Sequence, residues 1–384
     1  MAIEAVDPRA RGFRNRPLED AVGLVGLMRR LDWVLLAATG SAVAFGIWSI
    51  GGITRHDPGG SAASRQALYA AVGGVVLVVA ALINPALYRR FWKAIYVALC
   101  GVMAFVLVFG AATRGSKRWI DIGFFTFQPS EFGKVLLAVV LGAFLADRAK
   151  QVDRIRVPLE TMVLAAGPVA LVFLQPDAGT ALVYTAVLVA VLFVAGVRWL
   201  HLALIAGVGL VVVLGVLWWL PSAGVNVLKP YQTARLTNSN SYNLMESKIA
   251  VGSGGLRGRG VAGATQTALD YLPAHATDFA FASLAEQRGF LGAAVLLLLY
   301  LLVVWRGLKI VTIAPDLYGA IVAAGIVFGF LFQVFVNVGM TMGIAPITGI
   351  PLPFVSVGGS SMISNLAGIG VLLAIHARGG RRRP

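Results

Sequence analysis

Residues with the side chains needed for acid–base chemistry gather at one boundary of the chain. Asp278 lies in Leu272-Pro-Ala-His-Ala-Thr-Asp-Phe279, where a long polar stretch meets a long apolar one. A carboxylate at such a boundary can serve as a general base, or it can be an ordinary loop acid at a helix start. Position alone leaves the two interpretations about even, so Asp278 is the first candidate for a catalytic residue.

Cationic groups lie nearby in the sequence. The glycine-rich segment Gly252-Ser-Gly-Gly-Leu-Arg-Gly-Arg-Gly260 precedes the carboxylate. Glycine allows close backbone approach to a ligand, and arginine supplies charge and directed donors for a phosphate or pyrophosphate. Arg257 and Arg259 are candidates for such binding, and so are Lys117 and Arg118 further upstream. A basic loop that only touches anionic headgroups has the same composition, so this signal is weak by itself.

Other acids lie against expected helix starts. For Asp177 and Glu131 we favour a capping role, in which the carboxylate complements the helix dipole. Glu131 and Lys134 are three residues apart, so on a helix they could pair with each other or line a cavity. Glu286 lies further into its helix and needs a partner. The four histidines have no metal-ligand spacing, and the sequence contains no phosphate-binding loop of the nucleotide type.

The composition is that of a polytopic membrane protein. Of 384 residues, 58% are hydrophobic and 13% are charged, against roughly 25% charged residues in soluble proteins. The net charge of +15 comes from basic residues that flank apolar runs, which indicates a membrane surface and argues against nucleic-acid binding. The single Cys100 excludes an internal disulfide. The first apolar run is long enough to span, so we expect no separate cleavable signal.

A helix needs about 20 apolar residues to cross the hydrocarbon of a bilayer. The sequence predicts an all-α polytopic membrane protein with ten transmembrane helices, at roughly 31–53, 66–83, 94–113, 132–146, 158–174, 178–197, 199–220, 280–304, 317–339 and 359–376.

The distribution of Lys and Arg predicts the orientation. With both termini in the cytoplasm, 20 of the 32 basic residues lie on the inner side. We therefore expect a cytoplasmic segment 1–30, a single transmembrane domain 31–377 and a basic tail 378–384. The large loop at about 221–279 between the seventh and eighth spans is then extracytoplasmic, and Asp278 lies at the outer face.

Seven motifs, in this order, resemble the SEDS family (shape, elongation, division and sporulation) over nearly the whole chain. They are Gly115-Ser-Lys-Arg-Trp-Ile, Phe127-Gln-Pro-Ser-Glu131-Phe-Gly-Lys134, Gln175-Pro-Asp-Ala-Gly-Thr180, Ser247-Lys-Ile-Ala-Val-Gly-Ser-Gly-Gly255, Leu272-Pro with Thr277-Asp-Phe279, Gly349-Ile-Pro-Leu-Pro-Phe354 and Ser356-Val-Gly-Gly-Ser-Ser361. Two of them, Gly252-Ser-Gly-Gly255 and Gly349-Ile-Pro-Leu-Pro353, are similar to the RodA elongation branch rather than the FtsW division branch.

The resemblance implies a peptidoglycan glycosyltransferase that polymerises lipid II at the outer face of the bacterial plasma (inner) membrane during cell elongation. It also implies a class B penicillin-binding protein, the transpeptidase, and the elongation machinery as partners, and an undecaprenyl-linked glycan as substrate. The essential aspartate of the family falls on Asp278. The resemblance and the charge pattern together give the expected substrate- and pyrophosphate-binding residues Lys117, Arg118, Gln128, Glu131, Ser253, Arg257 and Arg259.

The chain departs from the family pattern beside the aspartate. The family has Glu where this chain has Ala274, and its His directly precedes Thr-Asp, whereas here that place is Ala276 and His275 lies one position earlier. A role for the family's Glu or His therefore cannot be transferred.

The expected mechanism uses Asp278 as a general base on the 4-hydroxyl of the acceptor sugar, with inversion at the anomeric carbon and release of undecaprenyl pyrophosphate. Nearby cations, with a divalent ion such as Mg or Mn, would stabilise the leaving group. Two alternatives stay open: a lipid II flippase, and a non-catalytic scaffold that activates a penicillin-binding protein. The scarcity of ionisable groups inside the spans favours chemistry at one face over transport.

Overall fold

The computed structural model describes residues 30–55, 57, 62–113, 116–121, 126–215, 219–222 and 242–379. The elements before residue 200 are α2 (Trp33–Ile53), α3 (Ala63–Leu82), α4 (Pro85–Arg90), α5 (Trp92–Phe109), β1 (Ala111–Thr113), β2 (Ser116–Asp121), β3 (Thr126–Phe127), α6 (Pro129–Asp147), the 3-10 turn η1 (Ala149–Gln151), α7 (Arg156–Leu174) and α8 (Ala178–Val194). They are followed by α9 (Trp199–Leu214), α10 (Leu220–Ser222), α12 (Tyr242–Ser253), α13 (Gly260–Gly263), α14 (Thr265–Ala268), α15 (Ala280–Ile313), α16 (Leu317–Met342) and α17 (Gly359–Gly379).

The fold is a mostly helical membrane bundle, as predicted. Among the described residues, eight helices are long and apolar enough to cross a membrane, and α8 is a shorter apolar helix of 17 residues. Each of the ten expected segments overlaps a helix, and residues 216–218 of the expected span 199–220 lie outside the described residues. Their ends differ: α15 continues to Ile313 rather than ending near 304, because Arg306 is paired with Asp32 and Lys309 is exposed, so the helix accommodates both charges.

The structure corrects one segment. The expected span 94–113 is too long, since α5 ends at Phe109 and the chain leaves the helix at Gly110. The following residues form β1, the edge of a small antiparallel sheet of order β1-β2-β3. An all-α prediction omitted this sheet because its strands are only three, six and two residues long.

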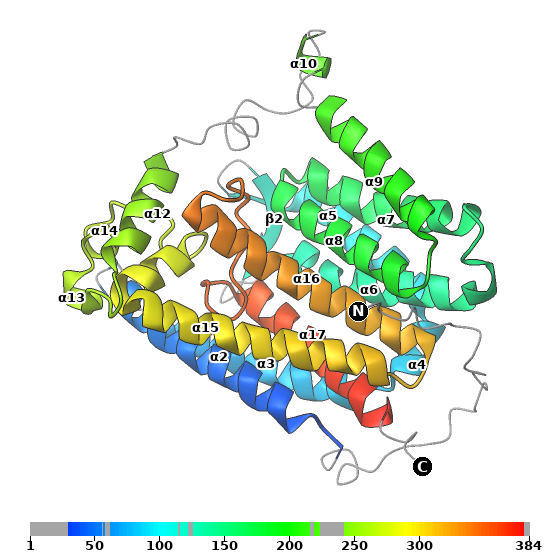
Figure 1. The fold of residues 1–384 in the computed structure, drawn as a ribbon, viewed down its shortest axis with the longest axis horizontal. Helices are drawn as coiled ribbons and strands as arrows, with labels where there is room; N and C mark the ends of the chain where they lie inside the picture. Colours follow the sequence, from blue (N-terminus) through cyan, green and yellow to red (C-terminus); the bar gives the residue numbers. More distant parts are fainter. Residues whose placement is uncertain are drawn as a thin grey trace.

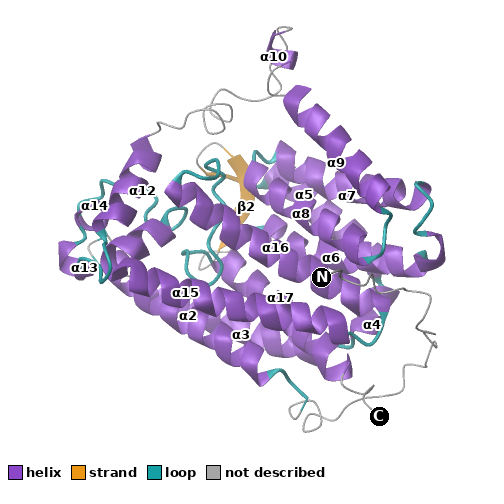
Figure 2. Ribbon diagram, viewed as in Figure 1, coloured by secondary structure: helices purple, strands orange, loops and turns teal. Residues whose placement is uncertain are grey.

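Helices α6, α16 and α17 form the centre of the bundle (Figures 1 and 2). Their membrane-length windows are 78%, 72% and 83% buried, against 17% for α5 at the periphery. Around them α3 packs on α17, α8 on α16, and α15 on both α2 and α16. Small residues permit this closeness: a Cβ added at Gly370 of α17 would lie 2.4 Å from the carbonyl oxygen of Leu77 in α3.

The glycine-rich loop completes a kink in α15. Gly289 has φ 67°, a left-handed conformation that breaks the helix. The N–H groups of Phe290 and Leu291 then donate to the carbonyls of Gly255 (2.8 Å) and Leu256 (3.1 Å). The loop can approach α15 this closely because residue 254 is a glycine. A Cβ added at Gly254 would lie 2.0 Å from the Ala285 carbonyl oxygen.

A buried ion pair joins three helices at the opposite end of the bundle from Asp278. Asp32 caps α2 by accepting from the Leu35 N–H at 3.0 Å. Its carboxylate also binds Arg306 of α15, with Nη2–Oδ2 2.6 Å, and His376 of α17 lies 3.9 Å away. The Asp32 side chain is 1% exposed, so its charge depends on these partners.

Replacing Arg306 with Met should lower the free energy of unfolding by about 3 kcal/mol, because it leaves the buried Asp32 carboxylate without its main counter-charge. The measurement is thermal unfolding of the purified protein in detergent. The matched control is Arg156→Met, which removes an exposed pair with Glu160 and should change stability by less than about 1 kcal/mol. Equal losses in the two variants would contradict this assignment.

Candidate functional site

Asp278 lies in a turn that is fixed by its backbone. The turn immediately precedes α15, and the Asp278 side chain is partly buried. Three consecutive carbonyls accept hydrogen bonds from other elements: Ala276 from the Val357 N–H (2.9 Å), Thr277 from Ser356 Oγ (2.5 Å) and Asp278 from Asn337 Nδ2 (3.0 Å). The position of the carboxylate is therefore set by α16 and by the segment that leads into α17.

The carboxylate faces the segment Gly349–Phe354. A Cβ added at Gly349 would lie 3.5 Å from Asp278 Oδ2, so the two residues are neighbours. Asn337, which is fully buried in α16, also donates to the Ile350 carbonyl at 2.7 Å. One amide thus holds both the Asp278 turn and this segment.

A second polar group surrounds Asp177. As expected, Asp177 caps α8, accepting from the Thr180 N–H (3.1 Å). Its Oδ2 also accepts from Gln128 Nε2 (2.9 Å) and lies 3.5 Å from Nη1 of Arg118. The guanidinium of Arg118 stacks on the Trp119 ring at 4.3 Å, and its buried Nε–H has no protein acceptor. Capping therefore accounts for only part of the role of Asp177.

Glu131 and Lys134 form the ion pair that their spacing allows. Lys134 Nζ lies 2.7 Å from Glu131 Oε2, and the two side chains are 4% and 7% exposed. The carbonyl of Glu131 accepts from Ser364 Oγ of α17 at 2.6 Å. Such a pair inside an apolar bundle is stable only while both charges are present.

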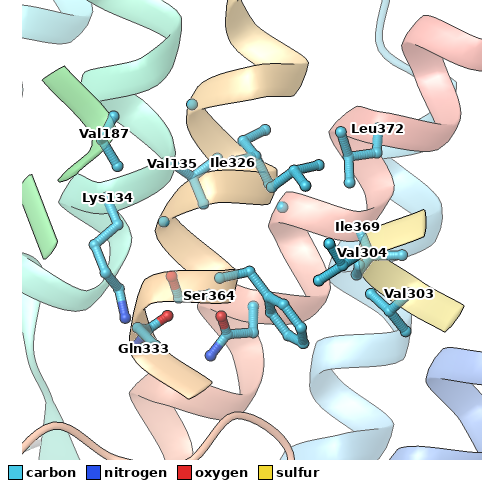
Figure 3. Close-up of a pocket in the computed structure, with 16 residues that line it drawn as sticks. Lys134, Val135, Val187, Val303, Val304, Ile326, Gln333, Ser364, Ile369 and Leu372 are labelled. Atoms are coloured by element: carbon cyan, nitrogen blue, oxygen red, sulfur yellow. The ribbon is translucent and has the colours of Figure 1, made fainter. Parts of the chain in front are cut away.

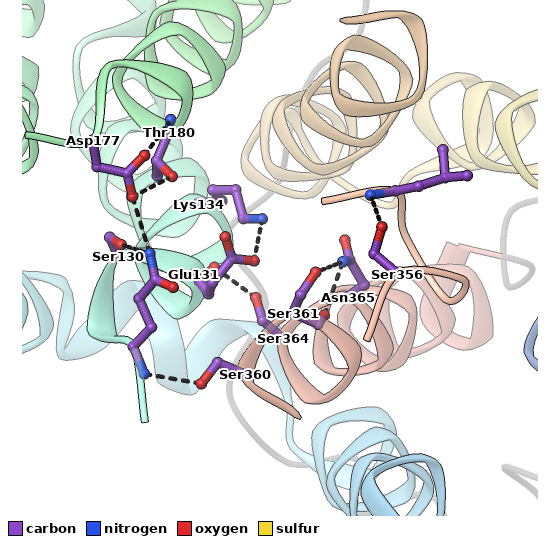
Figure 4. Close-up of polar contacts among 12 residues, drawn as sticks. Ser130, Glu131, Lys134, Asp177, Thr180, Ser356, Ser360, Ser361, Ser364 and Asn365 are labelled. Atoms are coloured by element: carbon purple, nitrogen blue, oxygen red, sulfur yellow. Dashed lines mark hydrogen bonds and ion pairs between the residues drawn. The ribbon is translucent and has the colours of Figure 1, made fainter. Parts of the chain in front are cut away.

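The N-terminal part of α17 joins these groups (Figure 4). Ser360 accepts from the Gln128 N–H and donates to the Thr126 carbonyl, both at 2.9 Å. One turn later Ser364 reaches Glu131, while Ser356 upstream holds the turn of Asp278. Asp278, Gln128 and Glu131 are therefore attached to one short stretch of chain.

A narrow pocket continues from this polar group into the bundle between α6, α8, α15, α16 and α17 (Figure 3). Lys134, Gln333 and Ser364 lie at one end of it, whereas Ile326 and Leu372 line its apolar part. The Nε2 of Gln333 is buried and has no protein acceptor.

The remaining predicted residues lie on other elements. Lys117 belongs by its backbone to β2, and its side chain lies outside what the structure describes. Ser253 ends α12 and donates to the Ala250 carbonyl at 3.0 Å. Arg257 is exposed, and Arg259 donates through Nε to the Ser253 carbonyl at 2.9 Å. This loop packs on α15, whereas Arg118 lies in β2 and Gln128 is the N-cap residue of α6.

The residues that hold the site together had no role assigned from the sequence, although Ser356 and Ser360 lie in one of the quoted motifs. Asn337, Ser356, Ser360 and Ser364 make its cross-element hydrogen bonds. Their signal in the sequence was a polar residue inside, or just before, an apolar helix. Which partner each would find could not be inferred, because these partners are distant in sequence.

Replacing Lys134 with Met should destabilise the protein by about 3 kcal/mol, since the buried Glu131 carboxylate is left uncompensated. The double variant Glu131→Gln, Lys134→Met should regain a large part of this loss. Thermal unfolding of the two single variants and the double variant measures the coupling. Strictly additive losses would show that the two side chains act independently.

Relatives of the chain match most of its length. It is 37% identical over 315 residues to the peptidoglycan glycosyltransferase MrdB of Escherichia coli (strain K12), covering 80% of this chain and 83% of that protein. It is 30% identical over 387 residues to the peptidoglycan glycosyltransferase RodA of Treponema pallidum, covering 82% of this chain and 89% of that protein.

Solved structures show the same fold. The rod shape determining protein RodA of Thermus thermophilus matches with a TM-score of 0.68 at 28% identity, over 92% of this chain and 98% of that one. A chain from a peptidoglycan synthase complex matches with a TM-score of 0.78 at 29% identity, over 90% and 97%. A family model described as cell cycle protein, FtsW/RodA/SpoVE, matches residues 29–380. The chain therefore belongs to this family, the SEDS family that its motifs resemble.

Proposed function

We propose that the chain is a peptidoglycan glycosyltransferase that polymerises lipid II during cell elongation. The observation that carries this proposal is the fixed turn of Asp278, which the stretch from Ser356 to Ser360 joins to a group containing Gln128, Asp177 and Arg118. A base and cations on one framework are what a one-step glycosyl transfer from a pyrophosphate donor needs. The relatives named peptidoglycan glycosyltransferases support the same reaction.

In the proposed reaction, Asp278 takes the proton of the 4-hydroxyl of the acceptor lipid II. The oxygen forms a bond to the anomeric carbon of the growing undecaprenyl-linked glycan while the bond from that carbon to the pyrophosphate oxygen breaks. An α-linked donor gives a β-linked product by this single inversion, so one base suffices. The proton then leaves Asp278 for solvent, and undecaprenyl pyrophosphate is released.

The leaving pyrophosphate develops negative charge, and several groups can stabilise it. Arg118 has a buried Nε–H without a protein acceptor, so it retains a donor for a ligand. The N-termini of α6, α8 and α17 meet through Gln128, Asp177 and Ser360, and helix N-termini favour anions. Arg257 and Arg259 remain candidates for the more distant part of the substrate.

The ten proposed spans are the eight longer helices together with α8 and α9. Both termini then lie in the cytoplasm of a bacterium, and the end of the bundle that carries Asp278 faces outward from the plasma membrane. The count of basic residues on each side supports this orientation.

A class B penicillin-binding protein is the proposed partner, within the elongation machinery. Its transpeptidase would cross-link the strands that this chain polymerises. The similarity to a chain of a peptidoglycan synthase complex supports such an assembly.

A divalent cation stays a prediction of the sequence. Within the described ranges, no group of three or more His, Cys, Asp or Glu side chains is placed so that it could hold a metal ion. The described side chains therefore do not form a set that fits an all-protein metal site, and we derive no step through a metal.

If polymerisation depends on a divalent ion, EDTA should abolish it and Mg²⁺ or Mn²⁺ should restore it. The measurement is glycan formation by the purified protein and its partner from lipid II, after removal of bound metal. Undiminished activity in excess EDTA would contradict the expected cofactor.

Asp278→Asn should lower the rate of lipid II polymerisation by about 10²–10⁴-fold, because a fixed general base contributes that much. The assay uses the purified protein with its partner, in detergent. The control Asp147→Asn, at an exposed pair with Arg89, should keep wild-type activity. Near wild-type polymerisation by the Asp278 variant would overturn the assignment. Movement of lipid II across vesicles without polymer would indicate a flippase, and neither activity would indicate a scaffold.

A further inference from the structure

His275 lies in the same turn as Asp278, and both of its ring nitrogens face oxygen atoms. Nε2 is 3.0 Å from Oδ1 of Asp57, in the segment between α2 and α3. Nδ1 is 3.2 Å from the Leu272 carbonyl oxygen and 3.3 Å from Oδ1 of Asp270. The side chain is 11% exposed, so water contributes little to its solvation.

The oxygen atoms on both sides of the ring match the two N–H groups of an imidazolium. A neutral imidazole has one N–H and one lone pair, whereas the imidazolium has two N–H groups. A carbonyl and ionised carboxylates offer acceptors only, so the neutral ring would place a lone pair against an oxygen on one side. The imidazolium can donate on both sides, to Asp57 and to Leu272 or Asp270, with charge assistance from the two carboxylates.

Other elements around His275 add no charge to this arrangement in the described contacts. From α15, Ser283 donates through Oγ to the His275 carbonyl at 3.1 Å. From the segment leading into α17, Val357 donates to the carbonyl of Ala276, the next residue. The charged partners are thus Asp57 and Asp270.

The ring is coupled to Asp278 through a short, well-held stretch of backbone. Only Ala276 and Thr277 separate the two residues, and the Phe279 N–H closes the turn by donating to the Ala274 carbonyl at 3.2 Å. Asn337 fixes the far end of this turn, at the Asp278 carbonyl. His275 fixes the near end by attaching it to a different loop.

We propose that the His275 imidazolium is a positioning residue that holds the turn of Asp278 against Asp57, so that polymerisation slows when His275 loses its proton. This inference rests on the proposed function, with Asp278 as the base. This contact between the His275 imidazolium and Asp57, which we call the clamp, is complete at low pH and is lost as the pH rises.

The test measures kcat and KM for lipid II with the purified protein and its partner, from about pH 5 to 8. At the acidic end, His275→Gln should lower kcat about tenfold, as expected for loss of one charge-assisted hydrogen bond, with KM changed less than about twofold. The ratio of wild-type to variant kcat should fall toward one as the pH rises. His201→Gln, at the start of α9, is the control and should keep the wild-type profile.

Asp57→Asn tests the same contact from the other loop. An amide can present either its oxygen or its NH₂ group to the ring, so a neutral His275 is accommodated and the wild-type pH dependence should flatten. A His275→Gln variant with the wild-type kcat and pH profile would overturn the proposal, and so would an Asp57→Asn variant with an unchanged profile.

Hydrogen exchange separates failure of this inference from failure of the proposed function. After correction for intrinsic rates, amides of peptide 272–283 in the wild-type protein should exchange faster at the alkaline end than at the acidic end, and His275→Gln should remove this difference. This result holds even if the purified protein forms no polymer. Equal protection at both ends in the wild-type protein would overturn the clamp, whatever the activity.

Discussion

The site depends on the need of buried polar groups in an apolar bundle to find hydrogen-bond partners. The stretch from Ser356 to Ser364 meets this need across three elements: the Asp278 turn, the start of α6 and the start of β3. In water each hydroxyl could be satisfied by solvent, but within the bundle a missing partner costs about 1–3 kcal/mol. This requirement gives the segment one arrangement. The turn of Asp278 and the start of α6 are thereby held in fixed positions relative to each other.

Charge is handled in the same way. The described structure pairs two buried carboxylates with cations, Glu131 with Lys134 and Asp32 with Arg306, at opposite ends of the bundle. Glu286 is fully buried and accepts from the N–H groups of Gln266 and Thr267 instead. Arg118 and Asp278 differ from these buried groups, because their side chains are partly exposed. That difference separates groups that stabilise the fold from groups available to a substrate.

The glycine-rich loop shows how a motif can serve packing as well as binding. Two of its glycines, Gly254 and Gly258, are explained by close approach to α15, at Ala285 and Gln287, and its carbonyls complete the kink at Gly289. From sequence, a pyrophosphate clamp was one interpretation of these glycines, beside a basic loop that only touches anionic headgroups. Composition could not separate the two roles, because both need a backbone without side chains. The small sheet and the early end of α5 were likewise hidden, since such short strands carry no clear periodicity.

The sequence by itself determined the membrane class, the positions of the helical segments, the family, and the local relations that depend on spacing alone. The Asp177 cap and the pair Glu131–Lys134 are of this kind, because helix geometry brings residues three apart onto one face. Only the tertiary structure decided which distant residues meet. The contacts of Asn337 with Asp278, of Ser356 with Thr277 and of His275 with Asp57 join residues 59, 79 and 218 positions apart. Such contacts follow from how whole helices pack, and no local pattern encodes them.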